Sequence, residues 1–348
     1  MKKDRMLVLL ASVFVALSVA ALGRPLDAGG ADRPKSVSLA SAGEGTSQFA
    51  VHAGMTTLMT KYMGIRAVPE ASSVGGKTLH LLHNGEVEIG CSTDHAAHDA
   101  VLGSGQFEKS GKLNFRLMSA GAGFHLGLST LRESGIRSVR DLKGKKVQAT
   151  HPGNITFTKA MDLFLEAAGM TRADINELKF YGSRDIAPAL KEGRSAASVT
   201  GLSLSAVPGW LQNLNLEVPV LVFAPPREEI AAVLPNYPYF REGVASAKVY
   251  GKRVDGEDLH TIGAGMSLYC RTDLPDDFVY EIMKAVFDHK DELKAFHKSA
   301  DQWTDDLVGK PVAPFHPGAV RYYKEKGLWT TDLEKNQNRL LAEMGSSR

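Results

Sequence analysis

Hydrophobic residues along the chain alternate between short runs typical of β-strands and longer stretches spaced as in helices. Residues 37–40 (VSLA) are β-like, and a small, polar segment, residues 41–48, follows them. Apolar side chains then recur at helical spacing from Phe49 to Met63. This pattern predicts a strand, a glycine-containing loop and a helix, in that order.

The same order repeats further along the chain. Residues 65–71, 87–91 and 147–149 are predicted strands, and a helix predicted at residues 157–168 ends at Gly169. Strands that alternate with helices indicate an α/β fold with parallel strands. The polar loops follow the strands, and open α/β sheets bind ligands at the carboxyl ends of their strands.

The chain is long enough for two lobes, since its 348 residues exceed the ~150 of a typical domain. Residues 265–270 are predicted to return, as a strand, to the first half of the fold. We therefore predict two α/β lobes with a hinge and a ligand cleft between them. Lobe one is residues 37–145 plus 263–345, and lobe two is residues 146–262.

Residues 1–23 have the pattern of a secretory signal peptide. A basic start precedes an apolar run at residues 6–22, and small residues close it. An uncleaved membrane anchor is the alternative, because the run reaches the lower end of the spanning range of ~17–25 residues. Residues 24–36, rich in Gly, Pro and charge, predict a flexible tether. We expect a protein exported to the periplasm with its signal peptide removed.

Composition narrows the function classes. The formal net charge of +2 is not that of a polycation, so nucleic-acid binding has no support. Two cysteines exclude a disulfide scaffold. Cys91 and Cys270 could pair in an exported protein, or both could be free and buried, and both possibilities stay open.

Two loops carry small polar side chains suited to an anionic ligand. Residues 45–48 and residues 153–156 combine glycine with hydroxyl or amide groups at expected helix N-termini. Backbone N–H groups there can hold an anion without a buried cation. Neutral hydrogen bonds contribute only ~0.5–1.5 kcal/mol net each, which suits a binder that must release its ligand. Ordinary helix capping is the alternative for each residue alone.

The sequence gives little support for a metal site or for catalysis. His95 and His98, with Asp94 and Cys91 nearby, could hold zinc, but no H-E-x-x-H or C-x-x-C spacing is present. We expect Asp94 to cap a helix instead, and we predict no metal and no cofactor. No G-x-S-x-G elbow, Walker loop or S-x-x-K motif occurs, and residues 121–127 are a poor G-x-G-x-x-G. An enzyme is therefore not expected.

Several segments resemble the TAXI-type solute receptors of tripartite ATP-independent periplasmic (TRAP) transporters. They include the glycine loop at residues 43–49, residues 81–89 (LLHNGEVEI), 92–94 (STD), 141–147 (DLKGKKV), 152–156 (PGNIT) with 165–169 (LEAAG) and, most specific to the family, 316–323 (HPGAVRYY). The resemblance implies a periplasmic-binding-protein type II-like fold and TRAP permease subunits as partners. It also implies ligands such as glutamate and related dicarboxylates.

The first loop departs from the family pattern. Gln48 and Phe49 stand where the family has two tyrosines, and Glu44 adds a carboxylate. A carboxylate beside the ligand would repel an anion unless it points to solvent or meets an amine, so an amino acid stays beside dicarboxylates as a candidate solute.

Together, the loops and the resemblance predict a set of ligand-binding residues. These are Gly45, Thr46, Ser47, Gln48, Phe49, Thr78, Ser92, Thr93, Gly153, Asn154, Thr156, Thr200 and Gly201. We predict a monomeric solute-binding protein that captures a small organic anion or amino acid and delivers it to a TRAP permease. An exported sensor partner of a membrane receptor is the alternative, and an enzyme on the same fold is a further one.

Overall fold

The computed structural model describes residues 33–44, 46–72, 75–152, 154–305 and 311–345. The predicted signal peptide, most of the predicted tether and two predicted site residues, Gly45 and Gly153, lie outside these described residues. Within the described part, no helix is both long enough and apolar enough to cross a membrane.

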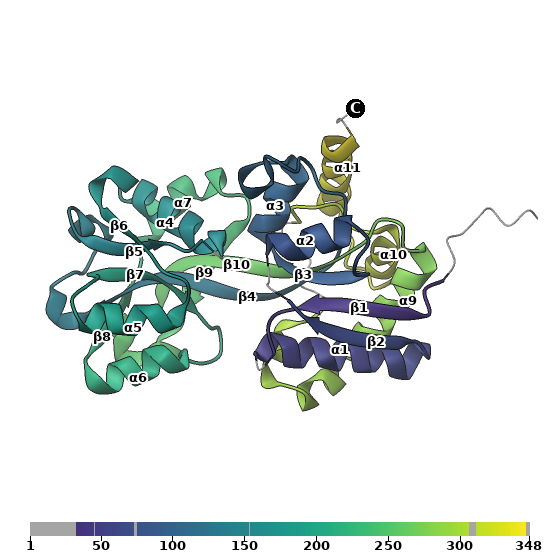
Figure 1. Ribbon diagram of the computed structural model, residues 1–348, viewed down its shortest axis with the longest axis horizontal. Helices are drawn as coiled ribbons and strands as arrows, with labels where there is room; N and C mark the ends of the chain where they lie inside the picture. Colours follow the sequence, from purple (N-terminus) through teal and green to yellow (C-terminus); the bar gives the residue numbers. More distant parts are fainter. Residues whose placement is uncertain (1–32, 45, 73–74, 153, 306–310, 346–348) are drawn as a thin grey trace, which may run out of the picture. The chain divides into compact units, whose positions relative to one another are not determined.

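Ten strands in the described part of the chain form one sheet (Figure 1). They are β1 (Ser36–Ser41), β2 (Arg66–Ala71), β3 (Ile89–Thr93), β4 (Arg116–Leu131), β5 (Lys146–Thr150), β6 (Asn176–Lys179), β7 (Ala197–Leu202), β8 (Val220–Phe223), β9 (Phe240–Ala245) and β10 (Leu259–Cys270). The order across the sheet is β2-β1-β3-β10-β4-β7-β5-β6, with β8 also paired to β4 and β9 to β10.

The helices connect these strands and cover both faces of the sheet. They are α1 (Ser47–Met63), α2 (Gly76–His83), α3 (Asp94–Leu102), α4 (Ile155–Ala167), α5 (Ser183–Lys191), α6 (Gly209–Glu217), α7 (Arg227–Val233), α8 (Ala247–Tyr250), α9 (Asp276–Phe287), α10 (Pro317–Glu325) and α11 (Thr331–Gly345). In Figure 1, α2 and α3 lie on the opposite face of the sheet from α1. The predicted α/β class is confirmed.

Parallel pairing follows the predicted strand–helix repeat. β1 is parallel to β2 and β3, and β5 is parallel to β6 and β7. β10 is antiparallel to β3, β4 and β9, so the strand predicted to return to the first half does so. Glycine ends two of the helices, since α1 stops at Gly64 (φ 65°) and α3 at Gly103 (φ 67°), both left-handed positions that suit glycine.

Two hydrophobic cores lie along this sheet. The first core joins side chains from Val37 to Met118 with others from Leu268 to Tyr323. The second core contains side chains from Leu126 to Ala264. Side chains at residues 126–142 thus pack in the second core, although the sequence pattern placed them in lobe one. The reason is that the single long strand β4 contributes Leu117 and Met118 to the first core and Leu126 to Leu131 to the second.

The two cores meet along β4 and β10, which pair side by side and run from one core to the other. The register pairs Gly265 with Gly123 but Ser267 with Ala120, so β4 carries one extra residue, a β-bulge, at this point. Because side chains alternate along a strand, the bulge changes which face of the sheet the following residues of β4 occupy.

Candidate functional site

Glycines in the middle of β4, where it pairs with β10, let large side chains lie directly on the backbone. A Cβ atom on Gly121 would stand 2.0 Å from the Trp303 ring, and one on Gly123 would stand 2.3 Å from Nη2 of Arg241. Gly121 and Gly123 are therefore required by the packing of Trp303 and Arg241.

A cavity of about 320 Å³, here named the cleft cavity, lies beside this part of β4 and β10. It is lined by the start of α1, by β4 and β10, by the segment after β7, and by the turn η8 (Lys298–Gln302). Its lining residues are Ser47, Gln48, Gly123, Phe124, Ser203, Ser205, Ala206, Val207, Pro208, Met266, His297, Lys298, Ser299 and Gln302. The cavity thus touches elements of both cores and the two strands that join them.

The start of α1 supplies polar groups to the cleft cavity. Thr46 caps the helix, because its Oγ1 accepts a hydrogen bond from the Phe49 N–H (3.1 Å) and donates one to the Gly43 carbonyl (2.8 Å). Ser47 and Gln48 line the cavity itself. The first N–H groups of a helix have no partner within the helix and carry partial positive charge, so this end favours an anion.

Gln48 is held by a buried polar chain behind the cavity. Its amide nitrogen donates to Nε2 of His52 (2.9 Å) and lies 3.7 Å from Sγ of Cys91. Burial lowers the pKa of His52 to about 3, so the ring is neutral at pH 7. An imidazole that accepts at Nε2 must carry its proton on Nδ1, which donates to Oγ of Ser41 (2.7 Å).

Aromatic side chains form the opposite part of the site. Phe124, which lines the cleft cavity, stacks on Phe157 in the first turn of α4 (ring centroids 5.9 Å apart). A Cβ atom on Gly201 would lie 3.2 Å from the Phe157 ring, so this predicted site residue gives the ring its space. His151 packs on Phe157 from the loop after β5.

The turn η8 was not foreseen from the sequence. Lys298 is the only permanently charged residue among the described residues that line the cleft cavity, and it is exposed. His297 caps the turn through Nδ1, which accepts from the Ser299 N–H (3.1 Å). A neutral imidazole that accepts at Nδ1 presents Nε2–H as a donor. No motif marks this segment, which reaches the site through folding alone.

Several predicted site residues lie away from the cleft cavity. Thr78 is buried, with its Cγ2 against Gly90, and Thr200 is buried with Oγ1 2.6 Å from Oγ of Ser129. Ser92 donates to the Gly75 carbonyl (3.1 Å). These polar side chains satisfy the strands and loops around them.

The second predicted loop keeps its capping role. Asn154 caps α4 by accepting from the Thr156 N–H, and its own N–H donates to His151 Nδ1 (2.9 Å). Thr156 is buried, and its Oγ1 has no hydrogen-bond partner within the described residues. Neither residue lines the cleft cavity, and Glu44, which is exposed, does not line it either.

Asp94 does not cap α3, which corrects the expectation from the sequence. Thr93 is the cap, since its Oγ1 accepts from the Ala96 N–H (3.3 Å). The Asp94 carboxylate instead accepts hydrogen bonds from two β10 side chains, Ser267 (2.6 Å) and Tyr269 (3.2 Å). Thr93 occupies the N-cap position, one residue before Asp94, and β10 offers the Asp94 carboxylate two hydroxyl donors.

The neighbouring histidines pack rather than converge on a metal. His95 Nε2 lies 3.3 Å from Asp99 Oδ2, and both His95 and His98 meet the Tyr239 ring edge-on. In the part of the chain that the structure describes, no group of three or more His, Cys, Asp and Glu residues is placed to hold a metal ion. Cys91 and Cys270 lie on the paired strands β3 and β10, and both are free and buried.

Comparison with known proteins gives one family match and several similar structures. Residues 39–327 match the model of the NMT1-like family. The chain is similar to the periplasmic aliphatic sulphonate binding protein SsuA from Escherichia coli (14% identity over 87% of this chain and 92% of that one, TM-score 0.47). It is also similar to MatC from Rhodopseudomonas palustris with bound malate (14% identity over 89% and 98%, TM-score 0.48). What each of these binds is a property of that protein.

Proposed function

The chain belongs to the NMT1-like family, and we propose that it is an extracytoplasmic solute-binding protein whose ligand occupies the cleft cavity. One observation carries this proposal: elements of both cores and the two strands that connect them line the same polar cavity. A solute held there contacts both halves of the fold at once, as a receptor that closes on its ligand requires.

The lining chemistry supports a small organic anion. Lys298 supplies a positive charge, the start of α1 supplies backbone N–H groups, and Ser47 supplies a hydroxyl. Phe124 and Met266 give the solute an apolar wall. The carboxylate of Glu44 does not line the cavity, so the reason for keeping an amino acid beside simple organic anions as a candidate solute does not apply at this site.

A binding experiment tests this assignment. We expect a thermal-shift screen of organic acids to identify a stabilising acid, which mass spectrometry recovers unchanged after incubation with stoichiometric protein. Lys298→Met should weaken binding of that acid by about 1 kcal/mol, and Ser47→Ala by ~0.5–1.5 kcal/mol, measured by calorimetry. The uncharged amide of the same acid should be insensitive to Lys298→Met.

Lys294→Met is the matched control, because Lys294 is an exposed lysine close by in the chain that does not line the cleft cavity. If the double variant Ser47→Ala with Lys298→Met binds the acid as tightly as wild type, the solute lies elsewhere. Chemical conversion of the acid would move the protein to the enzyme class.

Delivery to a membrane permease of the TRAP type is the finer part of the proposal, and the resemblance of residues 316–323 to TAXI receptors supports it. In cells, deletion of this chain and deletion of the TRAP permease genes should each abolish uptake of the identified acid. Uptake that survives loss of every TRAP permease would point to another partner.

The periplasmic protein should begin between about residues 21 and 32 on N-terminal sequencing. An intact N-terminus in the membrane fraction would contradict export in soluble form.

A further inference from the structure

Two further cavities lie next to each other and share no lining residue with the cleft cavity. The inner cavity, about 250 Å³, is lined by Asp94, Ser267, Tyr269, Tyr239 and Arg241 together with apolar side chains. The outer cavity, about 620 Å³, is lined by α3, β9, α11 and the segments between them. Both contact Pro238, Phe240, Pro311 and Val312, which form the boundary between them.

Two opposite charges, Asp94 and Arg241, line the inner cavity without forming a salt bridge with each other. Oδ1 of Asp94 accepts from Ser267 and Tyr269, whereas Oδ2 lies over Gly265, where a Cβ atom would stand 1.9 Å away. Arg241 lies over Gly123, and its guanidinium makes no hydrogen bond or ion pair with any residue that the structure describes. Both groups therefore have bonding capacity left for a ligand.

These charges come from different parts of the fold. Asp94 begins α3, beside the first core, and Arg241 lies on β9, beside the second. Glycine at positions 123 and 265 gives each side chain the space that a Cβ atom would fill. Burial raises the pKa of Asp94, which the hydrogen bonds from Ser267 and the charge of Arg241 partly counteract. A ligand cation at Oδ2 would stabilise the ionised carboxylate further.

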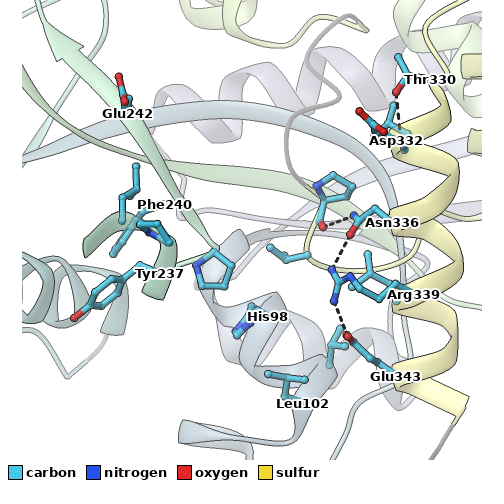
Figure 2. Close-up of a pocket in the computed structure, with 18 of the residues that line it drawn as sticks. His98, Leu102, Tyr237, Phe240, Glu242, Thr330, Asp332, Asn336, Arg339 and Glu343 are labelled. Carbon is cyan, nitrogen blue, oxygen red and sulfur yellow. Dashed lines mark hydrogen bonds and ion pairs between the residues drawn. The ribbon is translucent and has the colours of Figure 1, made fainter. Parts of the chain in front are cut away.

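The outer cavity offers apolar walls, and its charged residues are largely paired. Figure 2 shows α11 on one side, with Asn336, Arg339 and Glu343, facing Tyr237 and Phe240 on the other, while α3 contributes His98 and Leu102. Arg339 is bound to Glu343 (2.6 Å) and to Asn336 (2.7 Å). The side chain of Asn336 in turn donates to the Pro311 carbonyl (3.0 Å).

We propose that the inner and outer cavities together form a second ligand site, for an α-amino acid with an apolar side chain. The α-ammonium binds Oδ2 of Asp94, the α-carboxylate binds the guanidinium of Arg241, and the side chain extends past Phe240 and Val312 into the outer cavity. Arginine suits a carboxylate because its planar fork can donate two parallel hydrogen bonds. A predominantly apolar pocket with a few convergent polar groups is typical of small-molecule sites.

Three probes with one apolar body test the two charges separately. They are L-phenylalanine, 3-phenylpropanoate, which lacks the ammonium, and 2-phenylethylamine, which lacks the carboxylate. Calorimetry on the protein expressed from its full sequence should show L-phenylalanine binding at least tenfold more tightly than either other probe. Asp94→Asn should remove the preference over 3-phenylpropanoate, and Arg241→Gln the preference over 2-phenylethylamine.

The variants are chosen to keep the fold. Asparagine at position 94 retains an oxygen that can accept from Ser267 and Tyr269, and Arg241 is exposed. Asp277→Asn and Arg140→Gln make the same chemical changes at exposed positions outside all three cavities and should leave L-phenylalanine affinity unchanged. Circular dichroism confirms folding of every variant.

Different results would refute the second site and the proposed function of the cleft cavity. If L-phenylalanine, L-leucine and L-methionine all fail to bind, or if L-phenylalanine binds no better than the singly charged probes, the second site is refuted. It is also refuted if Lys298→Met and Ser47→Ala abolish L-phenylalanine binding while Asp94→Asn and Arg241→Gln leave it intact, because the amino acid then occupies the cleft cavity.

Discussion

Replacing Trp303 by alanine is expected to lower the free energy of unfolding by about 3–5 kcal/mol, the range for a fully buried aromatic side chain. Trp303 is 1% exposed, and its ring meets the His52 ring edge-on at 5.2 Å. It also covers Gly121, which has no side chain to fill the space left behind. Urea unfolding followed by far-UV circular dichroism measures the change.

A control and a companion variant make this test specific. Leu216→Ala, at a side chain 81% exposed, should change stability by less than about 0.5 kcal/mol. Gly121→Ala should destabilise wild type, because the new methyl group would meet the Trp303 ring, but should cost much less in the Trp303→Ala background. Additive effects of the two substitutions would contradict the contact described here.

Stability should fall in acid partly because of His52, and replacing it should flatten that fall. The pKa of His52 is lowered from 6.5 to about 3 in the folded protein by burial. As the pH falls below 6.5, His52 therefore gains a proton in the unfolded state, whereas in the folded state it stays neutral down to about pH 3. The contribution of the neutral ring to folding stability is complete above pH 6.5 and is lost as the pH falls from there. Between pH 6 and 4 this residue alone accounts for about 2–3 kcal/mol.

Urea unfolding of wild type and His52→Gln at several pH values between 7 and 4 measures this contribution. The comparison is of the slopes of stability against pH, so the basal stability of the variant does not affect the result. His125, whose pKa is lowered to about 4 by burial and by Arg241, is present in both proteins and cancels. Parallel curves for the two proteins would show that His52 does not titrate as described.

Much of the fold was predictable because its signals are local. The apolar run at residues 37–40, the helical spacing after Phe49 and the glycine at position 169 each act over a few residues, and the structure has β1, α1 and α4 at or near these places. The point at which β4 passes from one core to the other was not predictable, because the bulge at residues 121–122 depends on pairing with β10. The helix α11 is mostly polar, and no pattern distinguished it.

The site was predictable only on the side of α1. Ser47 and Gln48 follow a strand and a glycine loop, and they line the cleft cavity. Thr200 has the same character in the sequence, yet its hydroxyl faces Ser129 inside the sheet. No local sequence pattern marks Lys298 or Arg241, because only folding brings η8 and β9 next to the paired strands β4 and β10. Solute binding by the predicted residues stays a prediction.

The late position of β10 in the chain has a consequence for synthesis and truncation. β3, residues 116–126 of β4, and β9 all pair with β10. A chain made from its N-terminus keeps these strand edges open until residues 259–270 exist, and open edges invite pairing with other chains. A chain that stops before residue 259 would lack a strand of each core rather than one complete half, so neither half could be obtained by simple truncation at that point.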